Sequence, residues 1–158
     1  MRIVKFSPSF LEGIVRVHCP KWKEMPPHMR VRECSYWGDP KVFNWYVENL
    51  LSIDGRILVA LKDGEVIGEA EVVPERFRSP VGEHAYLQMV WVREEERRTG
   101  VGKQLVSECC NIAKGMNFNA LDTIPYDEAT AFFEAIGFSE IESQVLMEAQ
   151  PRPAPEQP

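Results

Sequence analysis

Hydrophobic residues recur along this chain with two periods, and the change from one period to the other predicts a mixed order of helices and strands. Apolar positions three or four apart indicate helices, while short runs rich in β-branched and aromatic residues indicate strands. Strands are expected over 2–6, 55–61, 65–73, 84–92, 119–124 and 143–149. Helices are expected over 8–18, 40–50, 101–116 and 127–136.

Two helix starts are marked by the same pair of residues. Ser7-Pro8 and Asp39-Pro40 each place a capping side chain before a proline at the first helical position. Gly137 fits the position just past the end of the last helix. The segment 19–38, rich in Pro, Trp and Met, predicts a long ordered loop between the first two helices.

The clearest turn signal is Asp63-Gly64, which suits the tight turns of β-hairpins and lies between two strand-like runs. Gly68 inside the second run indicates a β-bulge. The strand, helix and strand over 84–124 favour a local parallel pair. Together these elements predict an α+β fold, a mixed sheet flanked by helices.

Length and charge narrow the class further. The chain has 158 residues, which predicts one domain over 1–148, and a proline-rich tail over 149–158 that we expect to be disordered. A net charge of −6 argues against a general nucleic-acid binder. No apolar run is long enough to cross a bilayer, and the first residues show no signal-like stretch, so we expect a cytoplasmic protein without a membrane partner.

The cysteines and histidines predict neither a disulfide nor a metal site. The four cysteines have no C-x-x-C spacing, and the three histidines are scattered, so we expect reduced thiols and no metal. Cys109 lies on the apolar stripe of its helix, and neither it nor Cys110 has a placed basic partner. Both are therefore interpreted as core residues rather than nucleophiles.

The stretch "RRTGVGKQL" over 97–105 combines arginines with glycines at a predicted helix start. A P-loop would need glycine where Arg97 stands and Ser or Thr where Gln104 stands. A dinucleotide fingerprint would need glycine where Leu105 stands. Both motifs fail.

The pattern R-x-x-G-x-G remains, and it suits an anion. Free N–H groups in the first turn of a helix point outward, the helix dipole favours negative charge there, and glycines let a ligand approach. The glutamates at 94–96 would oppose binding unless they turn away, as we expect. The simpler alternative is a glycine turn that only starts a core helix.

Two segments carry a family resemblance. "LQMVWVREEERRTGVGKQLV" over 87–106 and "ATAFFEAIGF" over 129–138 resemble motifs of the GCN5-related N-acetyltransferases (the GNAT family), and the order of elements over 1–148 is similar. The resemblance implies a mostly antiparallel sheet with a splayed parallel pair that forms an acyl-CoA cleft. It also implies acetyl-CoA as co-substrate, bound by Val90, Val92, Arg97, Arg98, Thr99, Gly100, Val101, Gly102 and Lys103.

The same resemblance raises the question of which residue acts as the general acid that protonates the leaving thiolate. It implies that the N–H of Val90 donates to the oxyanion, and that a tyrosine protonates the leaving thiolate. Phe133 stands where many family members have that tyrosine. Tyr126, two turns earlier, could replace it or could be a packing residue; a dedicated acid could also be missing altogether.

The base is equally open. By strand alternation Tyr86, Gln88 and Val90 share a face, and Tyr86 or Gln88 could orient a water. Glu69 and Glu71 share a face of the neighbouring strand and could accept a proton through water, or they could simply lie on a solvated outward face. Glu83 and His84 are interpreted as rim residues.

The segment before the second helix is expected to form the acceptor wall, by the same resemblance. Trp22, Met25, Tyr36 and Trp37 could line a pocket, or equally form a small core beneath the loop; His28 is interpreted as a surface residue. The implied activity is transfer of an acetyl group to a primary amine, by direct attack on the thioester. A non-catalytic acyl-CoA-binding module is the alternative, and a cofactor-free interaction domain is a third; homodimerisation is an analogy with the family.

Overall fold

The computed structural model describes residues 1–34, 39–75 and 84–140 and has two compact units, Met1–Thr123 and Ile124–Pro158. In the first unit the elements are β1 (Arg2–Lys5), a 3₁₀ turn (Pro8–Phe10), α1 (Leu11–His18), α2 (Pro27–Cys34), α3 (Pro40–Ser52), β2 (Arg56–Lys62), β3 (Glu65–Glu75), β4 (His84–Val92), a 3₁₀ turn (Glu94–Glu96), α4 (Val101–Gly115) and β5 (Ala120–Asp122). The second unit contains α5 (Asp127–Ala135). The expectation of one domain over 1–148 stays a prediction.

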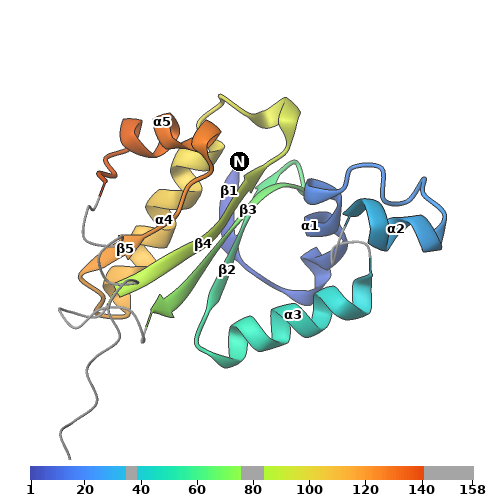
Figure 1. Ribbon diagram of the computed structural model, residues 1–158, viewed down its shortest axis with the longest axis horizontal. Helices are drawn as coiled ribbons and strands as arrows, with labels where there is room; N and C mark the ends of the chain where they lie inside the picture. The colour runs from blue at the N-terminus through green and yellow to red at the C-terminus, as the bar shows by residue number, and fades with distance from the viewer. Residues whose placement is uncertain (35–38, 76–83, 141–158) are drawn as a thin grey trace, which may run out of the picture. The chain divides into compact units, whose positions relative to one another are not determined.

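The first unit is built on a five-stranded sheet with the order β1-β2-β3-β4-β5 (Figure 1). Neighbouring strands are antiparallel except β4 and β5, which are parallel. This confirms the predicted α+β class with a mixed, mostly antiparallel sheet. The parallel pairing runs only from His84 opposite Ala120 to Tyr86 opposite Asp122, while β4 continues to Val92.

Helices cover both faces of this sheet, with α1 and α3 on one side and α4 on the other (Figure 1). The α1 and α3 side is closed by a continuous apolar cluster that includes Ile14, Phe43 and Val59, all fully buried. On the opposite side, Val101, Leu105 and Cys109 form the buried stripe of α4, as their helical spacing predicted. The packing therefore fixes which strand residues face which layer.

The hairpin turn and the cap at Asp39 agree with the sequence signals, whereas the cap predicted at Ser7 is wrong. Asp63 and Gly64 have φ values of 52° and 84°, the left-handed geometry that a tight hairpin turn requires. The side chain of Asp39 accepts a hydrogen bond from the backbone N–H of Lys41 at the start of α3. Ser7 precedes the first helical turn without making a side-chain cap.

Two β-bulges shift the register between neighbouring strands. The second one changes which residues of β4 share a face. The pairing shifts between Ala60 and Leu61, beside Gly68 as expected. It shifts again on β3 after Glu71, which leaves Gln88 as the extra residue on β4.

Directly paired residues put their side chains on one face. Tyr86 is paired with Val73, whereas Val90 is paired with Ala70, so Tyr86 and Val90 lie on opposite faces. The prediction that Tyr86, Gln88 and Val90 share a face is therefore wrong, because simple alternation does not survive a bulge.

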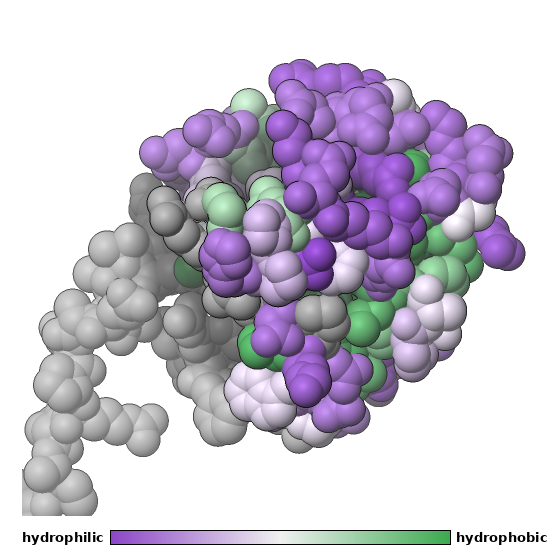
Figure 2. Space-filling model, turned by 90° about the vertical axis from the view of Figure 1, so that its right-hand side faces the viewer, coloured by the Kyte–Doolittle hydropathy of each residue, from purple (hydrophilic) through white to green (hydrophobic). Residues whose placement is uncertain are grey.

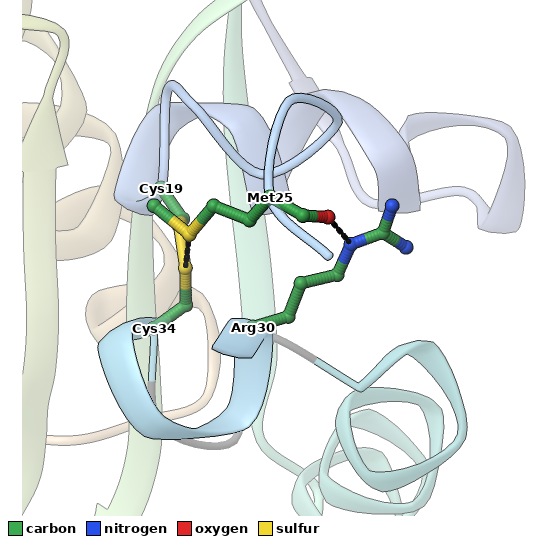
Figure 3. The surroundings of a disulfide bond; sticks show 4 residues. All are labelled: Cys19, Met25, Arg30 and Cys34. Atoms are coloured by element: carbon green, nitrogen blue, oxygen red, sulfur yellow. Dashed lines mark hydrogen bonds between the residues drawn. A yellow bond between two sulfur atoms is a disulfide. The ribbon is translucent and has the colours of Figure 1, made fainter. Parts of the chain in front are cut away.

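The predicted loop over 19–38 contains a helix, α2, which begins at Pro27 after a second proline. Its mainly polar sequence gives no apolar stripe, so periodicity could not reveal it. A disulfide joins Cys19, after the end of α1, to Cys34 at the end of α2, with a Cα–Cα distance of 5.8 Å (Figure 3). The expectation that all four cysteines are reduced is thus wrong for this pair.

The second unit ends its helix as predicted, with Gly137 at a φ of 101° just past α5. Phe133 is buried and makes edge contacts with Phe132 and Phe138. The expected strand over 143–149, the tail and the aromatic residues Tyr36 and Trp37 lie outside the described residues.

Candidate active site

The start of α4 has the geometry of an anion-binding turn. Arg98 and Gly100 lie in the left-handed region, with φ values of 63° and 90°, and no atom lies within 4 Å of where a Cβ on Gly100 would stand. The first helical hydrogen bond runs from the N–H of Gln104 to the carbonyl of Gly100, at 3.1 Å. The N–H groups of Val101, Gly102 and Lys103 precede that bond, so they have no acceptor within the helix.

The charges beside this turn are arranged to favour an anion. Arg97 donates from Nε to the carbonyl of Val92 at 3.1 Å, and its guanidinium lies 5.7 Å from the ring centre of Trp91. Arg97 is thereby held at the end of β4. Arg98 and Lys103 are exposed.

One of the three glutamates before the turn is neutralised by a lysine. Glu96 is paired with Lys62 at 2.8 Å, and Glu94 and Glu95 are exposed. Thr99 donates from its hydroxyl to the carbonyl of Glu96 at 2.7 Å, which stabilises the loop. The site can therefore hold a phosphate-bearing ligand through backbone amides and nearby cations.

A second feature lies on the other side of the sheet, where β3 carries two buried carboxyl groups. Glu69 and Glu71 are both 0% exposed. The alternative that placed them on a solvated outward face is wrong, because α1 and α3 cover that face. His18 on α1 contacts Glu69, and the Tyr46 hydroxyl on α3 donates a hydrogen bond to Glu71.

This cluster reaches the surface through β4. The side-chain amide of Gln88 donates to the Tyr46 hydroxyl at 2.7 Å, and Gln88 is exposed. Gln88 can reach Tyr46 because the bulge turns it toward the α3 side. A chain of hydrogen bonds thus runs from an exposed amide, through a phenol, to the buried carboxyl of Glu71.

Burial sets the protonation of the cluster. It raises the pKa of Glu69 to about 8. It also raises the pKa of Glu71 to about 8, with the charge of Glu69 adding to the effect, while the Tyr46 hydrogen bond and the charge of His18 oppose it. Burial lowers the pKa of His18 to about 4, against the charge of Glu71. At neutral pH the cluster is therefore held uncharged, and Glu71 becomes a proton acceptor in the mildly alkaline range.

Sequence reasoning named Glu71 and Gln88 but not their partners His18 and Tyr46. Both partners lie within the predicted helices over 8–18 and 40–50, in α1 and α3, where no local pattern marks them as partners of a strand. The usable signal was an alternating pair of glutamates inside an otherwise apolar strand, because buried carboxyl groups need polar partners.

The remaining candidates have separate places. Tyr86 is partly buried against the apolar cluster under α1 and α3. Tyr126 belongs to the second unit, and its side chain is exposed. His84 bonds through Nδ1 to Asp122 at 2.7 Å, which links β4 to β5. Burial raises the pKa of Cys109 to about 12, which removes it as a nucleophile, in agreement with its interpretation as a core residue.

The expected acceptor wall is only partly described. Trp22 and Met25 pack, partly buried, against the apolar cluster, and His28 is exposed. Arg30 lies over the Trp22 ring. It also donates to the carbonyl of Met25 at 2.9 Å (Figure 3). These contacts favour the small-core alternative for Trp22 and Met25. Glu83 lies outside the described residues.

The described part of the chain contains no cluster of three or more potential metal-ligating side chains. Nor does any helix described here have the length and apolar character needed to cross a membrane. The face shown in Figure 2 carries both polar and apolar surface rather than one uniform patch.

Comparisons with known proteins agree on one family. The model of the acetyltransferase (GNAT) family matches residues 21–138. No curated protein matches the sequence. Similar solved structures include a glucosamine-6-phosphate N-acetyltransferase from Arabidopsis thaliana, with 20% identity, a TM-score of 0.68, and 89% of this chain and 92% of that chain covered.

Two further structures have the same fold. An aminoglycoside N-acetyltransferase in complex with CoA is 20% identical, with a TM-score of 0.70 and 89% of each chain covered. An acetyltransferase from Trypanosoma brucei is 15% identical, with a TM-score of 0.68, 89% of this chain and 94% of that chain covered. At these identities the likeness describes the fold.

Proposed function

Because the chain belongs to the acetyltransferase (GNAT) family, we propose that it transfers an acetyl group from acetyl-CoA to a primary amine. The observation that carries this proposal is the turn before α4. Its left-handed Arg98 and Gly100, and the first-turn amides of Val101, Gly102 and Lys103, suit a pyrophosphate. We also place the protein in the cytoplasm and regard a homodimer as an analogy with its family.

The residues of this turn fit the CoA pyrophosphate. The space around Gly100 is open on the side where a Cβ would stand, so the phosphate oxygens can approach the amides. Arg97, Arg98 and Lys103 would add positive charge, and Thr99 would hold the loop. Val90 and Val92 would offer backbone groups to the pantetheine arm along β4, beyond its pairing with β5.

Bound acetyl-CoA would supply the activated thioester. For the chain itself, the first task is to remove a proton from the ammonium form of the acceptor. Glu71 would accept this proton through Tyr46, whose oxygen has a second lone pair beside the one that Gln88 uses. Gln88 would hold the phenol in place, and Tyr86 would form the neighbouring wall.

The second task is to stabilise charge on the carbonyl oxygen. The N–H of Val90 would donate to this oxyanion, because a backbone amide on a rigid strand costs no reorganisation when the charge develops. Phe133 cannot protonate a leaving thiolate, since a phenyl ring carries no donor. Tyr126 is the remaining candidate for that acid.

One observation favours a second function, a non-catalytic acyl-CoA-binding module. Phe133 is buried among phenylalanines, so the position of the usual acid is apolar. Such a module would keep the turn before α4 and would bind acetyl-CoA without turnover. The buried pair of glutamates supports the enzyme instead, because carboxyl groups with strongly raised pKa values occur preferentially at functional sites.

Calorimetric titration tests the proposal. Acetyl-CoA, CoA and ATP are titrated into the wild type and into the double variant Gly100→Glu, Gly102→Glu, whose folding is checked by circular dichroism. We expect micromolar binding of acetyl-CoA and CoA that the variant loses. A folded wild type that binds neither CoA species would refute the proposal.

Turnover then separates the enzyme from the binding module. Release of CoA is followed spectrophotometrically with a panel of primary amines that includes small amines, lysine peptides and peptides with a free N-terminus. Amine-dependent release supports the enzyme. Tight binding without release across the panel supports the module.

A further inference from the structure

Two carboxyl groups stand side by side on one face of β3, and each has a single hydrogen-bond partner among the described residues. Glu69 contacts His18 through Oε1, and Glu71 accepts from Tyr46 through Oε2. The second oxygens, Glu69 Oε2 and Glu71 Oε1, are buried without a hydrogen-bond partner in the described part of the chain. Each group is therefore satisfied on one side only, and the charge of Glu69 acts on Glu71.

We propose that His18 and Glu69 are positioning residues that set the proton affinity of Glu71, so that the four side chains act as one proton-accepting unit. This inference rests on the proposed function in giving Glu71 the role of base. The unit has an inner half, His18 with Glu69, and an outer half, Glu71 with Tyr46. The outer half alone reaches the surface, through Gln88.

The surroundings of Glu71 leave few other groups to set its affinity. From β2, its register partner is the apolar Ile57, and from β4 it is Met89. Among the described residues, the titratable side chains that act on Glu71 are Glu69 on its own strand, Tyr46 from α3 and His18 from α1. The described residues bring no lysine or arginine into contact with either glutamate.

The inner half is also the better shielded one. The side chains of Glu69 and His18 are 0% and 6% exposed. The ring of His18 packs 5.4 Å from that of Trp91, which is the register partner of Glu69. The contact between His18 and Glu69 is therefore shielded from water, so His18 can hold the Glu69 carboxyl beside Glu71.

The two inner residues act on Glu71 in different ways. A negative Glu69 disfavours ionisation of Glu71, so Glu69→Gln should lower the pKa of Glu71. His18, whose pKa is lowered to about 4, is neutral where Glu71 titrates, so it acts by holding Glu69 through their contact. His18→Gln keeps the Glu69 carboxyl and should therefore shift the Glu71 midpoint less than Glu69→Gln does.

The test is a titration of the Glu71 carboxyl carbon by ¹³C NMR on the full chain. Its resonance is assigned as the one that disappears in Glu71→Gln. In the wild type we expect Glu69 and Glu71 to titrate well above exposed glutamates. In Glu69→Gln the Glu71 midpoint should fall by about one pH unit, and in His18→Gln it should change less.

Glu65→Gln is the matched control, because Glu65 lies on the same strand and is exposed. It should leave the Glu71 midpoint unchanged. Wild-type carboxyl groups that titrate like exposed ones, or a Glu71 midpoint that Glu69→Gln does not lower, would overturn the inference. The wild-type titration tests the raised pKa values of the two glutamates even where a variant does not fold.

This measurement also separates the inference from the proposed function. It needs neither acetyl-CoA nor an acceptor. A lowered Glu71 midpoint in Glu69→Gln without any CoA release would uphold the proton unit and reject the enzyme. CoA release without this shift would uphold the enzyme and reject the unit.

Discussion

The Tyr46 hydroxyl donates a hydrogen bond to Glu71, across the contact between α3 and β3. The bond therefore joins Tyr46, which is partly exposed, to the fully buried carboxyl group of Glu71. Tyr46 also accepts from Gln88 on β4 at 2.7 Å, so three elements meet at one phenol oxygen. The phenol is thus the point at which a proton from outside would enter the buried unit.

Tyr46→Phe should reduce kcat/KM at neutral pH by roughly tenfold or more, because the Tyr46 hydrogen bond lowers the pKa of Glu71 and its loss raises that pKa by about one unit. The alkaline plateau should begin at a higher pH. Steady-state kinetics over about pH 6 to 10, a range that spans such a pKa, measures both the lower kcat/KM and the shifted start of the plateau.

Tyr126→Phe is the comparison for this prediction, because it removes an exposed phenol from the second unit. If Tyr126 is the acid, Tyr126→Phe should change the pH profile of kcat/KM on its alkaline side and should leave the rising limb unchanged. A Tyr46→Phe enzyme with an unchanged rising limb would contradict the relay through Tyr46.

The stability of the wild type should fall as the pH rises from mildly acidic to mildly alkaline values. A carboxyl group whose pKa is raised from 4.5 to about 8 stays protonated in the fold while the unfolded chain ionises. Each such group costs about 1.4 kcal/mol for every pH unit within that window. His18, with its pKa lowered to about 4, has the opposite effect and removes stability as the pH falls below about 6.5.

Glu69→Gln should therefore gain stability relative to the wild type between pH 5 and 8, about the window that the shifted carboxyl defines. Urea unfolding at several pH values gives the free energy of unfolding that tests this. The exposed Glu65→Gln should show no such pH-dependent gain. A difference between Glu69→Gln and wild type that does not change with pH would contradict a raised pKa at Glu69.

Most of the fold could be predicted because its signals are local. Asp39-Pro40, Asp63-Gly64 and the glycines before α4 are read within a few residues, and the structure places the start of α3, a hairpin turn and the start of α4 there. The helix α2 could not be predicted, because such a local signal is missing from its sequence. Its polar sequence contains no local apolar pattern, and a covalent bond to Cys19 holds its end.

The site was predictable only where the chain is continuous. The turn over 97–103 is one segment, so its chemistry is visible in sequence. The base cluster gathers His18, Tyr46, Glu71 and Gln88 from four separate elements, and no spacing rule links them. The bulge that turns Gln88 toward Tyr46 is a long-range event as well, because it depends on how β3 and β4 align.

Gly100→Ala should weaken acetyl-CoA binding, and Gly64→Ala should not. The two glycines have similar φ values, 90° and 84°, and open space around each missing Cβ. Both substitutions should therefore cost about 1–2 kcal/mol of stability from the left-handed backbone alone. Only Gly100 stands beside the first amides of α4, where a methyl group would obstruct a pyrophosphate.

Calorimetric binding and urea unfolding on both variants separate strain from ligand contact. Equal losses of stability with a loss of affinity in Gly100→Ala alone are expected. Equal affinities in the two variants would show that the turn before α4 does not hold the ligand.

Reduction of the Cys19–Cys34 disulfide should destabilise the first unit. The bond closes a loop with a sequence separation of 15, and a loop of that size contributes about 3 kcal/mol by constraining the unfolded chain. Beyond the bond, the described contacts within this loop are modest, such as the Arg30 hydrogen bond to Met25. We therefore expect a lower Tm in dithiothreitol, and the same loss in Cys34→Ser without reductant.

Thiol titration of the denatured protein counts the free cysteine thiols directly. Without reductant we expect the two thiols of Cys109 and Cys110 to react, and all four cysteines after reduction. Cys110→Ser is the matched control, because it removes a free thiol on α4 and should leave the effect of dithiothreitol on Tm intact. Four reactive thiols in the untreated protein, with a Tm that dithiothreitol does not change, would contradict the bond. Without that bond, α2 would no longer be joined covalently to Cys19, the residue that follows His18 at the end of α1.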